Sequence, residues 1–150
     1  MDEVRPGPSP FERAVMWYGR VPTESWSDIV DHYRLNYDRG CGGERYRPIV
    51  RLVETIAASS YAPVLFGRWT LPCRMDHRQG QLDLSRTRLL IKQHQMLAVS
   101  YVCEEEWFLF EYYEAAQKSK PWATASAAAD GFAELERVLR KRLRWFQRSG

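Results

Sequence analysis

Residues 89–113, LLIKQHQMLAVSYVCEEEWFLFEYY, carry the clearest β-sheet pattern in the chain. Three apolar segments, residues 89–92, 96–103 and 107–113, alternate with two short polar breaks. Breaks of this length fit the connections of β-hairpins. The stretch therefore predicts consecutive antiparallel strands arranged as a meander.

The last of these strands predicts a sheet that is covered on both faces. Alternate side chains of a strand point to opposite faces, so Trp107 and Leu109 share one face while Phe108, Phe110 and Tyr112 share the other. Both sets are apolar, whereas a strand with water on one side alternates between apolar and polar residues. We therefore expect helices of the same chain, or a second copy of it, to cover both faces and exclude water from them.

Length and composition predict one globular domain. The chain has 150 residues, of which 45% are hydrophobic and 13% aromatic, which suits a single core and excludes a mostly disordered chain. No apolar run approaches the roughly 20 residues of a membrane helix. Residues 1–8 contain acidic residues and prolines rather than the apolar run of a secretory signal. We expect them to form a flexible tail before a single domain at residues 9–150.

The cysteines predict a reducing environment. Cys41, Cys73 and Cys103 are odd in number and widely spaced, so a disulfide framework is not expected. Together with the character of residues 1–8, this predicts a cytoplasmic protein with free thiols.

Helices are predicted before the meander. A capping box of Ser9, Pro10 and Glu12 starts a short helix that ends near Tyr18. Apolar residues at a 3.6-residue period mark two more helices. Their stripes are Trp26, Ile29, Val30, Tyr33 and Tyr37 in the second helix and Ile49, Leu52, Val53 and Ile56 in the third. Thr23 or Ser25 can cap the second helix.

Residues between these helices and the meander predict further strands. Residues 62–69 and 81–85 have β-type content, and residues 70–81 are predicted as a long loop. With the meander, these segments predict an α+β fold of four or five antiparallel strands. Two or three N-terminal helices and one long C-terminal helix complete the expected layers.

The long C-terminal helix has the strongest pattern. Residues 115–123 are predicted as a connection because Pro121 blocks a helix. Thr124 or Ser126 is expected to cap a helix that ends near Phe146, with its basic residues opposite the apolar stripe. Arg142 falls within the apolar arc, so we expect it to find a carboxylate or to reach out of the interface.

Charge is segregated along the chain, although the net charge is only +3. Residues 104–114 hold five acids and no base, whereas residues 132–150 hold six bases and two acids. Two groups of binding residues are therefore predicted. The acidic group is Glu104, Glu105 and Glu106, and the basic face of the C-terminal helix is Arg137, Arg140, Lys141, Arg144 and Arg148.

The basic face allows three interpretations. Aligned cations can bind the phosphates of a nucleic acid. Cations near the C-terminus of a helix are also favoured by the helix dipole, without any ligand. A third interpretation pairs the acidic turn with this face inside the fold. The helix dipole is sufficient to explain the pattern.

The sequence offers few candidate catalytic or metal-binding residues. Cys73 and His77 lie four apart, but no second pair completes a zinc site. A thiol nucleophile could use His77 or His32 as its base, although His32 lies off its helical stripe and is expected to be solvated. No nucleophile elbow, phosphate-binding loop, dinucleotide fingerprint or zinc-protease motif is found. We therefore expect no metal and no cofactor, and we assign no catalytic residue.

The leading hypothesis is a small intracellular, non-catalytic protein that acts by contact with another protein, as regulators, inhibitors and immunity proteins do. Aromatic residues beside acids suit such a surface, and a homodimer would cover a second apolar face. One alternative is a nucleic-acid-binding protein that uses the basic face. The other is an enzyme that depends on Cys73 and His77.

Overall fold

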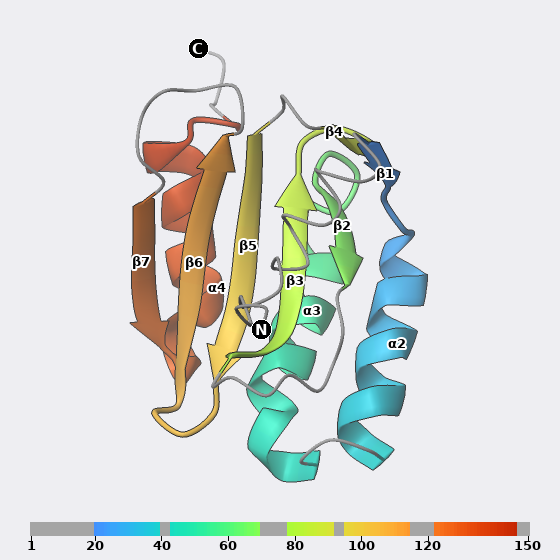
Figure 1. Cartoon of the computed structure of the whole chain (residues 1–150), viewed down its shortest axis with the longest axis vertical. Helices are drawn as coiled ribbons and strands as arrows, with labels where there is room; N and C mark the ends of the chain where they lie inside the picture. The colour runs from blue at the N-terminus through green and yellow to red at the C-terminus, as the bar shows by residue number, and fades with distance from the viewer. Residues whose placement is uncertain (1–19, 40–42, 70–77, 92–94, 115–121, 147–150) are drawn as a thin grey trace, which may run out of the picture.

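The computed structural model describes residues 20–39, 43–69, 78–91, 95–114 and 122–146, and its centre is a five-stranded antiparallel sheet (Figure 1). The strands lie in the spatial order β2 (Phe66–Trp69), β3 (Arg78–Ser85), β5 (Gln95–Val102), β6 (Trp107–Glu114) and β7 (Trp122–Ala127). The predicted α+β class and antiparallel sheet are confirmed.

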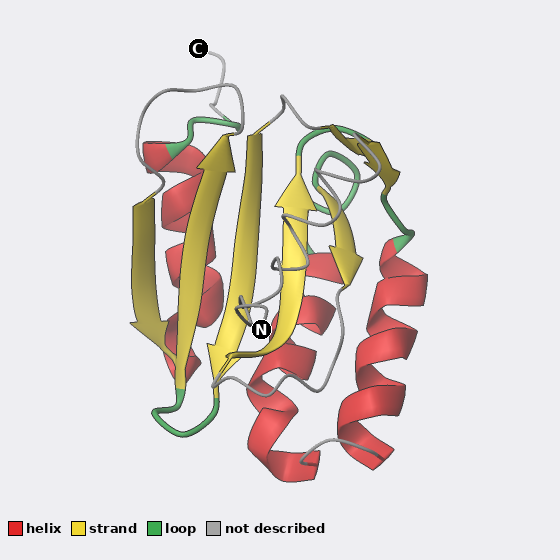
Figure 2. Cartoon of the chain, viewed as in Figure 1, coloured by secondary structure: helices red, strands yellow, loops and turns green. Residues whose placement is uncertain are grey.

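The helices form a second layer on one face of this sheet (Figure 2). They are α2 (Trp26–Arg39), α3 (Arg47–Ala57) and α4 (Gly131–Arg137), which continues as a π-helix over Val138–Arg142. The second and third predicted helices are confirmed. The amide of Asp28 donates to Ser25 Oγ at 3.1 Å, so Ser25 caps α2. The predicted tail and the helix from Ser9 lie outside the described residues.

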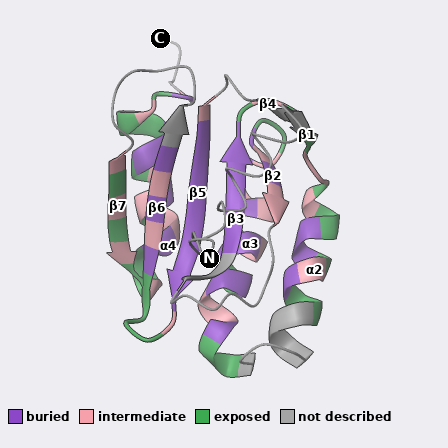
Figure 3. Ribbon diagram, in the orientation of Figure 1, coloured by how far each residue is buried: buried purple, intermediate pink, exposed green. Residues whose placement is uncertain are grey.

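The core fills the space between the two layers. Its sheet side consists of the alternate residues that point to the helices, and its helix side consists of the predicted apolar stripes. Buried residues are coloured purple in Figure 3 and run along β3 and β5. The largest fully buried side chains include Tyr33, Ile49, Leu84, Phe108 and Phe110.

Strand β6 is covered on one face only. Phe108 and Phe110 point to the helices and are 1% and 0% exposed, whereas Trp107 on the outer face is 41% exposed and Leu109 is half-buried. The prediction that neither face meets water is therefore wrong at Trp107. The physical reason is that all the described helices pack on the face of Phe108.

The meander differs from the prediction at its first strand. β4 (Leu89–Ile91) pairs with β1 (Arg20–Pro22) in a separate two-stranded sheet, and β5 pairs with β3 instead. Two boundaries also differ. The strand predicted at residues 62–69 begins only at Phe66, and Arg78 to Gly80, predicted as part of a loop, belong to β3.

The last strand, β7, replaces the predicted start of the C-terminal helix. Thr124 and Ser126 lie inside β7, and α4 begins only at Gly131, so the prediction that either residue caps the helix is wrong. The predicted connection at residues 115–123 is wrong at Trp122 and Ala123, because both belong to β7. Alanine favours helices, which obscured the strand-like alternation of Trp122, Thr124 and Ser126 with alanines.

Arg142 leaves the expected apolar arc because it belongs to the π-helical segment Val138–Arg142. The amide of Leu143 donates to the carbonyl of Val138 at 2.8 Å, which is the five-residue spacing of a π-helix. The wider turn shifts the residues of this segment from the helical phase that an α-helix would give them. Arg142 is exposed, and its guanidinium carbon lies 3.8 Å from the centroid of the Trp122 ring. The prediction that it reaches out of the interface is confirmed.

Gly131 sets how closely α4 approaches the sheet. A Cβ atom at this position would lie 2.6 Å from a ring carbon of Phe108, which is too close for a stable contact. Alanine gains about 1 kcal/mol over glycine in a helix, but overpacking a core contact costs about 1–3 kcal/mol. We expect Gly131→Ala to lower the free energy of unfolding by about 1 kcal/mol, measured by urea denaturation.

The double variant Gly131→Ala/Phe108→Leu is the control, because the smaller side chain makes room for the added methyl group. The double variant should lose less free energy of unfolding than the two single variants, Gly131→Ala and Phe108→Leu, lose together. A Gly131→Ala variant as stable as the wild type would show that close packing of α4 on Phe108 does not constrain the fold.

Candidate protein-binding surface

The predicted acidic turn is the hairpin that joins β5 to β6. Val102 pairs with Trp107, so the four residues from Cys103 to Glu106 form the turn. Glu104, Glu105 and Glu106 are all exposed. Glu106 has φ of 56°, the left-handed conformation that often closes such turns. The hairpin prediction is confirmed, and it gathers three carboxylates at one end of the sheet.

Trp107 stands directly after this turn. Its cross-strand neighbours are Val102 on β5 and Ala127 on β7. Alanine is too small to cover an indole ring, which explains why 41% of Trp107 is exposed. We call the three glutamates Glu104, Glu105 and Glu106 together with Trp107 the acidic end of the sheet.

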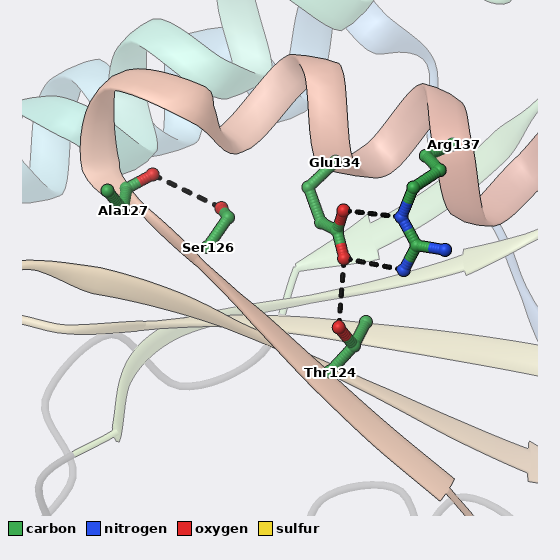
Figure 4. Close-up of polar contacts among 5 residues, drawn as sticks. All are labelled: Thr124, Ser126, Ala127, Glu134 and Arg137. Carbon is green, nitrogen blue, oxygen red and sulfur yellow. Dashed lines mark hydrogen bonds and ion pairs between the residues drawn. The ribbon is translucent and has the colours of Figure 1, made fainter.

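Strand β7, beside the acidic end, is anchored to α4 by one carboxylate (Figure 4). Glu134 accepts a hydrogen bond from Thr124 Oγ1 at 2.9 Å and two from the Arg137 guanidinium at 2.7 and 2.8 Å. The hydrogen bonds from Arg137 lower the pKa of Glu134 below its ordinary value. The ionised carboxylate thus holds the outermost strand against the helix.

The predicted basic face does not form one uniform surface. Arg137 binds Glu134, and Arg140 Nε donates to the Tyr61 hydroxyl at 2.5 Å while its guanidinium stacks on the same ring. The Tyr61 hydroxyl in turn donates to Glu136 at 2.9 Å. Two of the five predicted cations therefore already contribute to packing.

The other three predicted cations differ in position. Lys141 and Arg144 are exposed, and within the described ranges neither has an ion-pair partner. Arg148 lies outside the described residues. Arg144 has φ of 56° and follows the end of the helix.

The acidic turn and Arg142 lie at opposite ends of β7. The amide of Ala128, next to the C-terminal end of β7, donates to the carbonyl of Glu106 at 3.1 Å. Arg142 stacks on Trp122 at the N-terminal end of the strand. Figure 1 shows the hairpin and the end of the helix at opposite ends of the molecule. Among the described residues, no ion pair joins the acidic turn to Arg137, Arg140, Lys141 or Arg144, so these four cations do not pair with the turn as that interpretation expects.

Cys73 and His77, the residues of the enzyme alternative, lie outside the described residues. His32 is half-buried and stacks on Trp69 with the ring centroids 3.5 Å apart. Burial lowers its pKa, so the expectation of a solvated histidine is wrong. Among the residues that are described, no cluster of three His, Cys, Asp or Glu side chains could hold a metal ion.

Two further features were not predicted from the sequence. The outer face of β3 and β5 carries buried polar side chains, Gln81, Asp83, Ser85 and Ser100, which a partner cannot reach because they are at most 4% exposed. A groove of about 370 Å³ lies between α3 and the start of α4. Its rim includes Arg51, but its lining offers no nucleophile with an adjacent base.

No family model matches the chain, and no curated protein or solved structure matches it. Within the described part of the chain, no helix has the length and apolar character needed to cross a membrane. The function is therefore inferred from the geometry of this chain alone.

The anchoring of β7 by Glu134 depends on pH. Because Arg137 lowers the folded-state pKa of Glu134, the carboxylate stabilises the fold above its unfolded-state pKa, and this contribution is lost as pH falls through the folded-state value. We expect Glu134→Gln to lower the free energy of unfolding by about 1–2 kcal/mol at neutral pH. The difference in unfolding free energy between wild type and Glu134→Gln should shrink toward zero in acid. Urea denaturation at pH about 7 and about 3 measures this difference.

The matched control is Glu105→Gln, which removes a carboxylate from the exposed hairpin. It should change stability by less than about 0.5 kcal/mol at neutral pH. If Glu134→Gln costs the same at both pH values, the ionised carboxylate does not anchor the strand.

Proposed function

We propose that this protein is a small non-catalytic binding protein that acts by contact with another protein through the acidic end of the sheet. The observation that carries this proposal is Trp107, which is 41% exposed beside three exposed glutamates. Regulators, inhibitors and immunity proteins act through surfaces of this kind.

An exposed tryptophan is the side chain most suited to anchor such a contact. Trp, Tyr and Arg dominate the residues that carry most binding energy at protein interfaces. Burying the exposed ring of Trp107 in an interface would stabilise the complex, since apolar area removed from water contributes about 25 cal/mol per Å². The backbone of Trp107 pairs with Val102 and Ala127 in the central sheet, so binding does not have to order this backbone, which lowers the entropic cost.

The glutamates around Trp107 supply charge selectivity. Glu104, Glu105 and Glu106 lie on one hairpin turn, so their fields add and attract a basic partner surface. Charges at the rim of an interface accelerate association and reject partners of the same sign more than they add affinity. We therefore expect a partner with exposed Arg or Lys around an apolar pocket.

The two alternatives have weaker support. A nucleic-acid-binding surface would rely mainly on Lys141 and Arg144, because Arg137 and Arg140 have partners within the fold. An enzyme that uses Cys73 and His77 stays a prediction, because both residues lie outside the described ranges. A cytoplasmic location fits Cys103, which is a free thiol.

Trp107→Ala should abolish or strongly weaken partner binding. Truncating a residue that anchors an interface costs at least about 2 kcal/mol, or more than about tenfold in affinity. The full chain is used for affinity capture from its native lysate, and the recovered partner is then titrated against wild type and variant. Raising the salt concentration should slow association, because salt screens the attraction between the glutamates and a basic partner surface.

The matched control is Leu35→Ala, which also removes an exposed apolar side chain, 58% exposed on α2. It should leave partner binding unchanged. Failure to recover any stoichiometric partner, or equal binding by wild type and Trp107→Ala, contradicts the proposal.

A further inference from the structure

Strand β7 is an open edge of the sheet. It is last in the strand order, and within the described ranges no strand pairs with its outer side. Its six residues, from Trp122 to Ala127, include no proline and no charged residue, and its pairing with β6 has no bulge. Natural proteins protect exposed edges with such devices, because an open edge is a template for another strand.

The backbone groups that face outward can be assigned from the register. The amide of Ala128 donates to the carbonyl of Glu106, which places this pair at a hydrogen-bonded position of the ladder. Hydrogen-bonded and non-hydrogen-bonded pairs alternate along antiparallel strands. Thr124 and Ser126 therefore bond to β6, whereas Ala123, Ala125 and Ala127 direct their N–H and C=O groups away from it.

The same three residues leave room for another backbone. Ala123, Ala125 and Ala127 are all exposed, and a methyl group is the smallest side chain that a strand can carry apart from glycine. Figure 3 shows the alternation of exposed and half-buried residues along β7. The outward amides of all three residues and the carbonyls of Ala123 and Ala125 are available to a further strand. The Ala127 carbonyl accepts a hydrogen bond from Ser126 Oγ at 3.1 Å (Figure 4), and its second lone pair can accept another.

We propose that β7 pairs with β7 of a second copy of this chain, antiparallel and about a two-fold axis at Ala125. In this register Ala125 pairs with Ala125 of the partner copy, and Ala123 pairs with the partner copy's Ala127. Every outward amide and carbonyl of both strands then gains a partner. The two sheets become one continuous sheet, with both helix layers on the same face.

Charge complementarity favours a second copy in this orientation. The C-terminal end of β7 lies beside the glutamates of the hairpin, and its N-terminal end lies beside Arg142. An antiparallel pairing brings the acidic end of each copy next to the basic end of the other. A parallel pairing would place like charges together, which is unfavourable within a Debye length of about 8–10 Å.

The test is the association of the full chain, measured by sedimentation velocity over a range of concentrations. The wild type should form a dimer with a dissociation constant in the micromolar range, since edge pairing buries a small interface. A wild type that stays monomeric at about 100 μM overturns the proposal.

Charge variants at Ala125 locate the two-fold axis. Ala125→Lys and Ala125→Glu each place two like charges directly opposite each other in the dimer, which should weaken association about tenfold. An equimolar mixture of these two variants should form a heterodimer again, because opposite charges then meet. Thermal unfolding of each variant checks that the monomer remains folded.

Ala58→Lys is the control, because it adds the same charge at an exposed alanine that follows α3 and lies away from β7. It should dimerise like the wild type. If Ala125→Lys associates as well as Ala58→Lys, or if the mixture of Ala125 variants fails to recover the dimer, the proposed pairing is wrong. None of these outcomes depends on the partner proposed for Trp107.

Discussion

All the described helices pack on one face of the sheet, and this packing determines which side chains of β6 are buried and which meet water. Phe108 and Phe110 meet α3 and α4 at that face and are essentially unexposed, and Gly131 lets α4 approach closely. Because side chains alternate along a strand, burying these residues directs Trp107 to the opposite face. A tryptophan that would otherwise belong to a core is thereby left partly in water.

The same arrangement leaves β7 as the last strand and separates the charges along it. The hairpin places three carboxylates at one end, and the widened turn of the C-terminal helix places Arg142 on Trp122 at the other end. Glu134 holds the strand in place through Thr124. The molecule thus has an aromatic and acidic end, suited to a protein partner, and an open edge, suited to a second copy of itself.

The parts of the fold that could be predicted from the sequence are those with strong periodicity. The stripes at Ile29 and Tyr33, or at Ile49 and Ile56, are long enough to identify α2 and α3. β7 was missed because its alanines favour helices and its Thr124 and Ser126 resemble helix caps. The partners of Arg140 could not be predicted, because Tyr61 is distant in sequence and is brought near only by the fold.

If β7 is an open edge whose alanine amides face outward, residue-resolved amide hydrogen exchange in dilute solution will separate its residues into two sets. The amides of Thr124 and Ser126 should exchange slowly, because each bonds to β6, whereas those of Ala123, Ala125 and Ala127 should exchange fast. An Ala125 amide as protected as that of Thr124 in the dilute monomer would contradict an open edge at β7.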